Sequence, residues 1–200
     1  MRLLVATMNE GKLREYQRLL AEVPNLELET MASLKTRVDV EEDRDTFMGN
    51  ARKKATEIAA VAGLACLADD SGLEVDALGG RPGVLSARYA GEGATDARNN
   101  ERLLEELRAV PATERSARFR CAIVVTDAEG RELAAVDGAC EGRIGDAPRG
   151  THGFGYDPLF IPAGYEETMA ELGPETKNEI SHRAEAAAKL VPLLRELRNP

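Results

Sequence analysis

The sequence predicts an α/β protein with a mixed β-sheet. A short apolar run at residues 3–6 is followed by a polar turn and a helical pattern, which together make a strand, turn and helix unit. Two longer strand-like runs, 117–126 and 133–140, are neighbours in the chain and are joined by a turn at 127–130. Helical patterns alternate with such strands. This order favours a mixed sheet flanked by helices over a regular doubly wound sheet.

The N-terminal elements follow from the spacing of apolar residues. The run Leu3–Ala6 predicts a buried strand. A helix is expected from about Lys12 to about Glu22, because apolar residues recur on one side of it. A short alternating strand follows at 26–29, and the acidic stretch 39–45 predicts a loop.

The next segment carries paired carboxylates. Asp45 is expected to cap a second helix that runs to about Ala62, where Gly63 ends it. The apolar run 64–68 then predicts a central strand. This strand would deliver Asp69-Asp70-Ser71-Gly72 at its C-terminal end.

The remaining elements are placed in the same way. Residues 95–108 predict a helix, and after the two paired strands an extended stretch is expected at 154–161. The last helix should run from 182 to 197. Because Pro192 lies inside it, a kink or a break near Val191 is expected.

Composition narrows the class of protein. Two hundred residues, 43% of them hydrophobic and 30% charged, predict one globular domain. No apolar run approaches the roughly 18 residues of a membrane span, and we expect neither export nor membrane insertion. The three cysteines form no CxxC pair, so neither a disulfide framework nor a zinc site is indicated and a cytoplasmic location is expected. The net charge of −9 argues against nucleic acid as the partner.

The first turn has the features of a phosphate-binding loop. Thr7-Met8-Asn9-Glu10-Gly11-Lys12 ends a strand and opens a helix, so a hydroxyl, an amide, backbone N–H groups and an ammonium converge. The segment is neither a Walker motif nor a GxGxxG motif. The alternative is an ordinary N-cap at Asn9 beside a surface lysine.

Asp69 and Asp70 are the best candidates for metal and base chemistry, because Mg²⁺ prefers oxygen ligands and shares its shell with phosphates. Consecutive strand residues point to opposite faces, so one carboxylate would hold the metal while the other polarises water, unless a turn bends both inward. Glu41 and Glu42 are candidates to complete the site. The alternatives are an ordinary polar turn at 69–72 and a solvated acidic loop.

Two C-terminal segments are candidates for recognition of a flat, anionic ligand. Gly153-Phe154-Gly155-Tyr156-Asp157-Pro158 places aromatic faces between glycines, with Asp157 to bond the edge of a base; the alternative is a bulged strand whose aromatics fill the core. Glu179-Ile180-Ser181-His182-Arg183-Ala184 predicts a helix start with a basic first turn, which favours an anion there; the alternative is a Ser181 cap with both basic side chains in solvent.

Taken together, these segments resemble the inosine triphosphate pyrophosphatase family in its bacterial dITP/XTP branch. The resemblance covers nearly the whole chain. It is carried by Thr7-x-Asn9-x-x-Lys12, Glu41-Glu42, Asn50-Ala51-x-x-Lys54, Ala68-Asp69-Asp70-Ser71-Gly72, Gly79-Gly80-x-Pro82-Gly83, Ser86-Ala87-Arg88-Tyr89, Gly153-Phe154-Gly155-Tyr156-Asp157-Pro158, Lys177-Asn178 and Ile180-Ser181-His182-Arg183.

The resemblance implies a homodimeric, Mg²⁺-dependent enzyme: a single two-lobed domain over residues 1–200, with an elongated mixed sheet and a nucleotide cleft between the lobes. It implies hydrolysis of ITP, dITP and XTP to the monophosphate and pyrophosphate. Asp70 would be the general base, and Glu41 or Glu42 with Asp69 or Asp70 would hold Mg²⁺. The substrate-binding residues implied are Thr7, Met8, Asn9, Glu10, Gly11, Lys12, Lys54, Ser71, Phe154, Gly155, Tyr156, Asp157, Lys177, His182 and Arg183.

The chain departs from the family pattern at three positions. Met8 stands where Gly is usual, and Gly49 and Thr176 stand where Glu is usual. None of these changes removes a proposed catalytic group. Two other functions stay open from the sequence: a pyrophosphatase for modified pyrimidine or methylated nucleotides, and a nucleotide-binding regulator without turnover.

Overall fold

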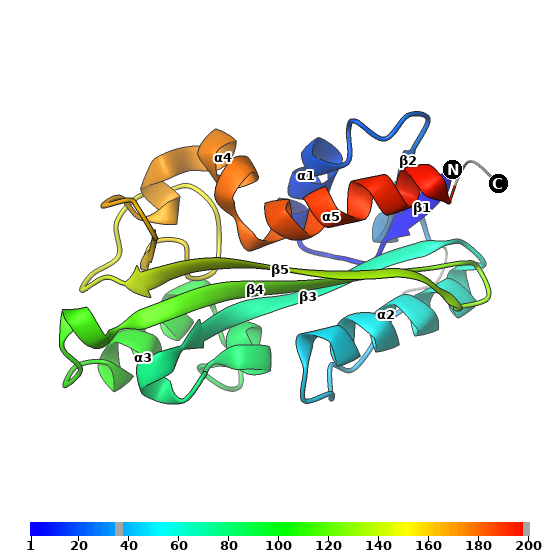
Figure 1. Cartoon of the computed structure of the whole chain (residues 1–200). Helices are drawn as coiled ribbons and strands as arrows, with labels where there is room; N and C mark the ends of the chain where they lie inside the picture. The colour runs from blue at the N-terminus through cyan, green and yellow to red at the C-terminus, as the bar shows by residue number, and fades with distance from the viewer. Residues whose placement is uncertain (35–37, 198–200) are drawn as a thin grey trace. The chain divides into compact units, whose positions relative to one another are not determined.

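The computed structural model describes residues 1–34 and 38–197. Its α-helices are α1 (Glu10–Leu19), α2 (Phe47–Ala62), α3 (Asp96–Glu106), α4 (Met169–Ile180) and α5 (His182–Glu196). Its strands are β1 (Arg2–Val5), β2 (Glu27–Thr30), β3 (Cys66–Val75), β4 (Ser116–Thr126), β5 (Glu132–Ile144) and β6 (Phe160–Pro162). Figure 1 shows these elements along the chain.

Within the described residues the strands form one six-stranded sheet in the order β2-β1-β3-β4-β5-β6. β1 pairs in parallel with both β2 and β3, whereas β5 pairs antiparallel with β6. The predicted α/β class with a mixed sheet is therefore confirmed. No helix within residues 1–34 and 38–197 is long and apolar enough to cross a membrane.

The chain divides into two compact units. Unit 1 comprises Met1–Asp70, Cys121–Gly138 and Arg183–Pro200, and unit 2 comprises Ser71–Arg120 and Ala139–His182. The long strands β3, β4 and β5 contribute residues to both units.

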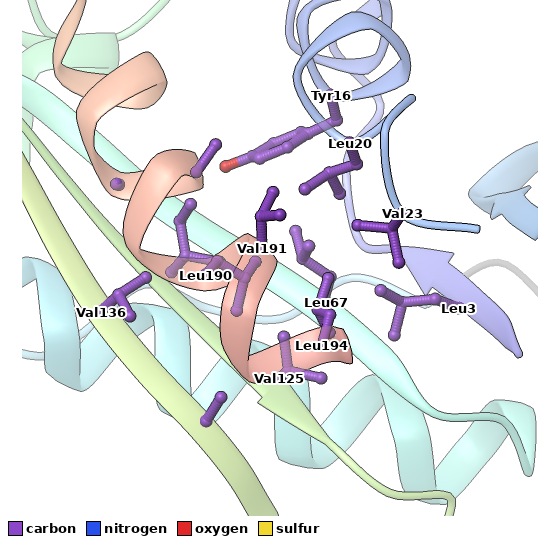
Figure 2. Close-up of a cluster of buried hydrophobic side chains, with 14 of the residues drawn as sticks. Leu3, Tyr16, Leu20, Val23, Leu67, Val125, Val136, Leu190, Val191 and Leu194 are labelled. Carbon is purple, nitrogen blue, oxygen red and sulfur yellow. The ribbon is translucent and has the colours of Figure 1, made fainter. Parts of the chain in front are cut away.

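Unit 1 has a hydrophobic cluster on each face of its part of the sheet. On one face, residues of α1 and α5 such as Tyr16 and Leu190 pack against Leu67 of β3, as Figure 2 shows. On the other face, Ala55 and neighbouring residues of α2 pack against Ala68. Successive residues of β3 thus enter different clusters, as the side-chain alternation of a strand requires. Figure 1 shows α1 and α5 on one side of these strands and α2 on the other.

Unit 2 has a core of its own. Buried residues of β3, α3, β4, β6 and α4 form one cluster, in which the rings of Phe119 and Phe160 lie 4.5 Å apart between centroids and are tilted by 53°. The glycine-rich turn that precedes β6 is built on this core, because Tyr156 and Leu159 belong to it.

Most of the predicted elements are present, but several boundaries were wrong. The first helix starts at Glu10, because the Asn9 side chain accepts from the N–H of Lys12 and so caps it, and it ends at Leu19. The second helix is capped by Thr46, which accepts from Gly49 N–H over 3.0 Å, and not by Asp45. Gly63 ends this helix as expected, in a left-handed conformation with φ of 63°.

The expectations for β3 and for residues 154–161 need larger corrections. β3 does not end before Asp69; it continues through the paired aspartates to Val75, so residues 69–72 are neither a strand end nor a turn. The extended stretch predicted at 154–161 is mostly turn, and only Phe160–Pro162 form a strand. Positive φ values of 79° at Gly153 and 63° at Gly155 are incompatible with a regular strand there.

Two helical details also differ. Helix α4 was not predicted; Gly173 has φ of 79° and Pro174 follows it, so the helical pattern is interrupted in the middle. Helix α5 runs through Pro192 to Glu196, and the break expected near Val191 is absent from this described segment.

Candidate functional site

Strand β3 directs its two aspartates to different partners in unit 1. Leu67, two residues before Asp69, faces the cluster of α1 and α5, and Ala68, two residues before Asp70, faces the α2 cluster. By the same alternation Asp69 meets Lys12 and Arg183, while Asp70 meets Asn50 of α2. Both carboxylates are buried.

Asp69 is the centre of a buried ion-pair network. Its Oδ2 lies 2.9 Å from Lys12 Nζ and 3.2 Å from Arg183 Nη2, and Nη1 of the same arginine binds Glu15. Burial alone would raise the pKa of Asp69, but the charges of Lys12, Arg183 and Lys54 hold it well below its usual range. Asp69 therefore stays ionised and holds the cations in place.

The structure places Arg183 in the interior and not at a solvent-exposed helix start. The residue is 1% exposed. The alternative interpretation, in which the Arg183 side chain lies in solvent, was therefore wrong. The reason is electrostatic: a buried guanidinium is tolerated because Glu15 and Asp69 accept its hydrogen bonds.

The first turn presents polar groups around the start of α1. Asn9 Oδ1 accepts from Lys12 N–H over 3.1 Å, and the N–H of Asn9 itself donates to Thr7 Oγ1 over 3.1 Å. The turn is thus shaped by its own side chains. Met8 is 73% exposed, so the residue that replaces the usual glycine adds an apolar side chain in solvent without occupying the core. Glu10 is exposed and Gly11 half-buried.

Asp70 lies in a different electrostatic setting on the α2 side. Asn50 Nδ2 donates to its Oδ2 over 2.8 Å, and Asn50 is fixed in turn because its Oδ1 accepts from Arg44 N–H over 2.8 Å. Burial and the Glu42 carboxylate raise the pKa of Asp70 to about 6, although Asn50, Lys54 and Lys12 act in the opposite sense.

Lys54 connects the two carboxylate settings. Its Nζ donates to the backbone oxygen of Asp69 over 3.0 Å and forms an ion pair with Glu42. Burial lowers the pKa of Lys54, but the charges of Asp69 and Glu42 outweigh this and raise it, so the side chain is a cation. The neighbouring Glu41 is exposed, and its backbone oxygen accepts a hydrogen bond from Lys53 Nζ over 2.9 Å.

Glu42 and Asp70 fit a magnesium site in which phosphate oxygens supply some of the ligands. Within residues 1–34 and 38–197, no three acidic, histidine or cysteine side chains form a cluster that would hold a metal alone. Mg²⁺ in nucleotide enzymes needs only one or two carboxylates, because phosphates and water complete its shell. The repulsion between Glu42 and Asp70, visible in the raised pKa of Asp70, is what a divalent cation would relieve.

In unit 2, the turn at residues 153–158 is held by a buried ion pair. Lys177 Nζ lies 2.5 Å from Asp157 Oδ2, and both side chains are almost fully buried. The same Oδ2 accepts from Phe154 N–H over 2.9 Å, and Lys177 Nζ lies 4.4 Å from the centroid of the Phe154 ring. A Cβ at Gly153 would come within 2.0 Å of Asp157 Oδ2, so the close approach requires glycine there.

Other predicted residues of unit 2 are placed in the core or beside it. Tyr156 is 4% exposed and its hydroxyl donates to the Ser86 oxygen over 2.8 Å, so this aromatic fills the core. His182 is buried, with its ring stacked on Phe119 at 4.9 Å between centroids. Ser71 continues β3 and is half-buried.

Sequence reasoning missed three residues that orient these side chains. Glu15 binds Arg183, and Asp96 and Asn100 bind the backbone of Gly155. Helical spacing is a usable signal for Glu15, which lies three residues after Lys12 on the same face of α1. No local signal marks Asp96 and Asn100, because each acts on a residue at least 55 positions away. Asn50 belongs to a quoted family motif, but its hydrogen bond to Asp70 was not predicted.

A mixed sheet that gathers lysine, arginine and carboxylate groups around one central strand defines an α/β protein with a buried ionic centre. The chain belongs to the Ham1 family, whose model matches residues 3–193.

Named relatives agree with this assignment. A protein from Geobacter sulfurreducens named dITP/XTP pyrophosphatase is 52% identical over 192 residues, which cover 94% of each chain. One of the same name from Bacillus licheniformis is 48% identical and covers 96% of each chain. The solved structure of a HAM1 protein from Coxiella burnetii superposes with a TM-score of 0.88 at 41% identity, covering 98% of this chain and 99% of that one.

Proposed function

We propose that this protein hydrolyses non-standard purine nucleoside triphosphates, ITP, dITP and XTP, to the nucleoside monophosphate and pyrophosphate, and so cleanses the nucleotide pool. The observation that carries the proposal is the arrangement around Asp69: Lys12 and Arg183 bind its carboxylate, and Lys54 binds its backbone oxygen and also Glu42, whose charge acts on Asp70. Relatives named dITP/XTP pyrophosphatase, nearly equal in length to this chain, support the choice of substrate.

Lys12 and Lys54 are the residues best placed to bind the triphosphate. Both are ion-paired with carboxylates but keep partial exposure, at 17% and 13% of the side chain. A polyphosphate approaching the turn at residues 7–12 would meet their positive charge together with the free end of a helix. Such groups stabilise the charge that develops as pyrophosphate leaves.

Glu42 and Asp70 are the residues we assign to Mg²⁺. They lie on the α2 side, and the charge of Glu42 acts directly on Asp70, whereas the Asp69 carboxylate is already held by Lys12 and Arg183. When bound, Mg²⁺ supplies neutralisation of the phosphate charge and polarisation of the P–O bond. Glu41 is the weaker candidate because its side chain is exposed.

Asp70 is the proposed catalytic base. Asn50 fixes Oδ2 of the carboxylate, and in its ionised form Asp70 would orient a water molecule toward the α-phosphorus. Asp69, which stays ionised because three cations surround it, instead holds Lys12 and Arg183. Two adjacent aspartates thus take different roles because their surroundings differ.

The turn that includes Phe154 is the proposed base-recognition element. The Phe154 ring is half-buried, and Lys177 and Asp157 fix the backbone on which it is mounted. Selectivity for a 6-oxo purine would come from hydrogen-bond donors, either backbone N–H groups or His182, that face the 6-oxo group. Adenine has an amino group at this position and would leave these donors without an acceptor. Arg183 would join them only by giving up one of its bonds to Glu15 and Asp69.

The proposal also includes Mg²⁺ dependence and a homodimer, which rest on the family resemblance, and a cytoplasmic location, which rests on the cysteine usage. The test is a panel of ITP, dITP, XTP, ATP, GTP and modified pyrimidine triphosphates, each incubated with the protein and Mg²⁺. We expect pyrophosphate and a monophosphate, with the oxo purines preferred. Orthophosphate as product, a preference for pyrimidines, or binding without turnover would each replace the proposal with a different function.

A further inference from the structure

Helix α3 holds both backbone polar groups of Gly155 in the base-recognition turn, the N–H of the peptide before it and the oxygen of the peptide after it. Asp96 Oδ2 accepts from the N–H of Gly155 over 2.7 Å, and Asn100 Nδ2 donates to the Gly155 oxygen over 3.0 Å. Asp96 and Asn100 are four residues apart, so they lie on one face of the helix and reach the turn together. All three residues belong to unit 2.

Packing does not explain the conformation of Gly155. The residue has φ of 63°, and a Cβ built on it would meet no atom within 4 Å. The space around this backbone is therefore open, in contrast to Gly153, where Asp157 fills it. The pair of hydrogen bonds from α3 fixes the Gly155 backbone on this side.

Asn100 is an unfavourable choice for stability alone. The residue is 7% exposed, and its Oδ1 has no hydrogen-bond donor among the described residues. A buried acceptor without a donor destabilises the fold, and an apolar side chain of similar size would avoid this cost. Its amide contributes through the bond that it donates to Gly155.

The Gly155 backbone that α3 holds lies between two residues that we assign to recognition of the base. Phe154 precedes it, and Asp157, which binds the N–H of Phe154, follows two residues later. A rotation of the peptide between Phe154 and Gly155 would change the direction of the Gly155 N–H and the plane of the neighbouring ring together. We propose that Asp96 and Asn100 are positioning residues that set purine selectivity by fixing the two peptides that flank Gly155; this rests on the proposed function.

The test compares variants of α3 in one assay. Asp96→Ala removes the acceptor, Asp96→Asn keeps an acceptor but loses the charge, and Asn100→Leu removes the donor. Glu101→Ala is the matched control, since Glu101 is an exposed acid on the same helix. The measurements are kcat and KM for dITP and for dATP, with thermal unfolding to identify variants that fail to fold.

We expect Asp96→Ala and Asn100→Leu to lower kcat/KM for dITP by about tenfold or more, mainly through KM, since a bond of this kind contributes about 1–2 kcal/mol. The ratio of kcat/KM for dITP to that for dATP should fall as well. Asp96→Asn should recover most of the ratio, and Glu101→Ala should match the wild type. A folded Asp96→Ala variant with an unchanged ratio would overturn the inference.

A second measurement separates this inference from the proposed function. Amide hydrogen exchange at Gly155 does not need turnover, and we expect its N–H to exchange at least tenfold faster in Asp96→Ala than in the wild type or Glu101→Ala. A wild type that releases no pyrophosphate from dITP would overturn the proposed function, whatever the exchange result. Equal exchange rates in all variants would show that Asp96 does not fix the Gly155 backbone, even if the enzyme is active.

Discussion

The side-chain amide of Asn50 donates a 2.8 Å hydrogen bond to Asp70, a carboxylate whose pKa is raised to about 6. The bond favours the ionised carboxylate and so partly opposes the effects of burial and of Glu42. A group in this balance changes charge close to neutral pH, and that property leads to two of the predictions below.

Replacing Asp70 with Asn should abolish turnover while nucleotide binding remains. The change keeps the shape of the side chain but removes the carboxylate that we assign to orienting water, and general-base catalysis typically contributes about 10²–10⁴ in rate. Pyrophosphate release and dITP binding are measured on the same preparation. Turnover within threefold of the wild type would show that Asp70 is not the base.

The same substitution should stabilise the metal-free protein in a pH-dependent way. A carboxyl whose pKa rises from 3.8 in the unfolded chain to about 6 in the folded protein stabilises the fold below about pH 4, and this stabilisation is lost as the pH rises through 6. At about 1.36 kcal/mol per pH unit, Asp70→Asn should gain up to roughly 3 kcal/mol relative to wild type between pH 4 and 7.

Urea unfolding in the presence of a chelator measures this difference. Adding Mg²⁺ at pH 7.5 should stabilise the wild type more than the variant and so narrow the gap. A gap that is the same at pH 4.5 and 7.5 would contradict the raised pKa of Asp70.

Lys12→Ala should weaken the binding of triphosphates more than that of monophosphates. The Lys12 ammonium lies at the start of α1 beside Asp69 and is assigned to the outer phosphates, so a ligand without them loses little. Arg14→Ala is the control, because Arg14 is an exposed cation on the same helix that pairs with Glu10. Calorimetry with ITP and IMP decides; equal losses for both ligands would place Lys12 away from the outer phosphates.

Arg183→Met should destabilise the fold by about 3–5 kcal/mol, because it leaves Glu15 and Asp69 without their buried cation. Arg195, which lies on the same helix as Arg183, forms a surface ion pair with Glu22 and offers a comparison. Arg195→Met should lower the free energy of unfolding by only about 0–1 kcal/mol. Urea midpoints of the two variants test this. Similar costs for both would mean that the Asp69 network adds little to stability.

The sequence predicted the elements whose apolar spacing is regular and failed where polar residues lie inside an element. Asp69 and Asp70 have low strand propensity, so residues 69–72 suggested the end of a strand. The strand continues because Lys12, Arg183 and Asn50 come from distant parts of the chain to partner the carboxylates. Such long-range compensation leaves no trace in local composition.

Helix α4 shows the opposite case, in which a local signal was present. Thr168 and Glu171 form a capping box, with Thr168 N–H donating to Glu171 Oε2 over 2.8 Å. Gly173 and Pro174 masked the helical period that should have followed it. Most candidate residues, such as Asp69 and Asp70, were found from residue patterns, and the family resemblance added their roles and others such as Lys54. The partners that orient them, such as Asn100, became visible only when the chain was folded.

Since the two aspartates of β3 face opposite sides, the length of this strand is as constrained as its composition. Inserting or deleting one residue in the strand before Asp69 would turn each aspartate to the opposite face of the sheet, toward the partners of the other aspartate. Residues of this centre can therefore be substituted, but an insertion or deletion that shifts the register of the strand would disrupt it.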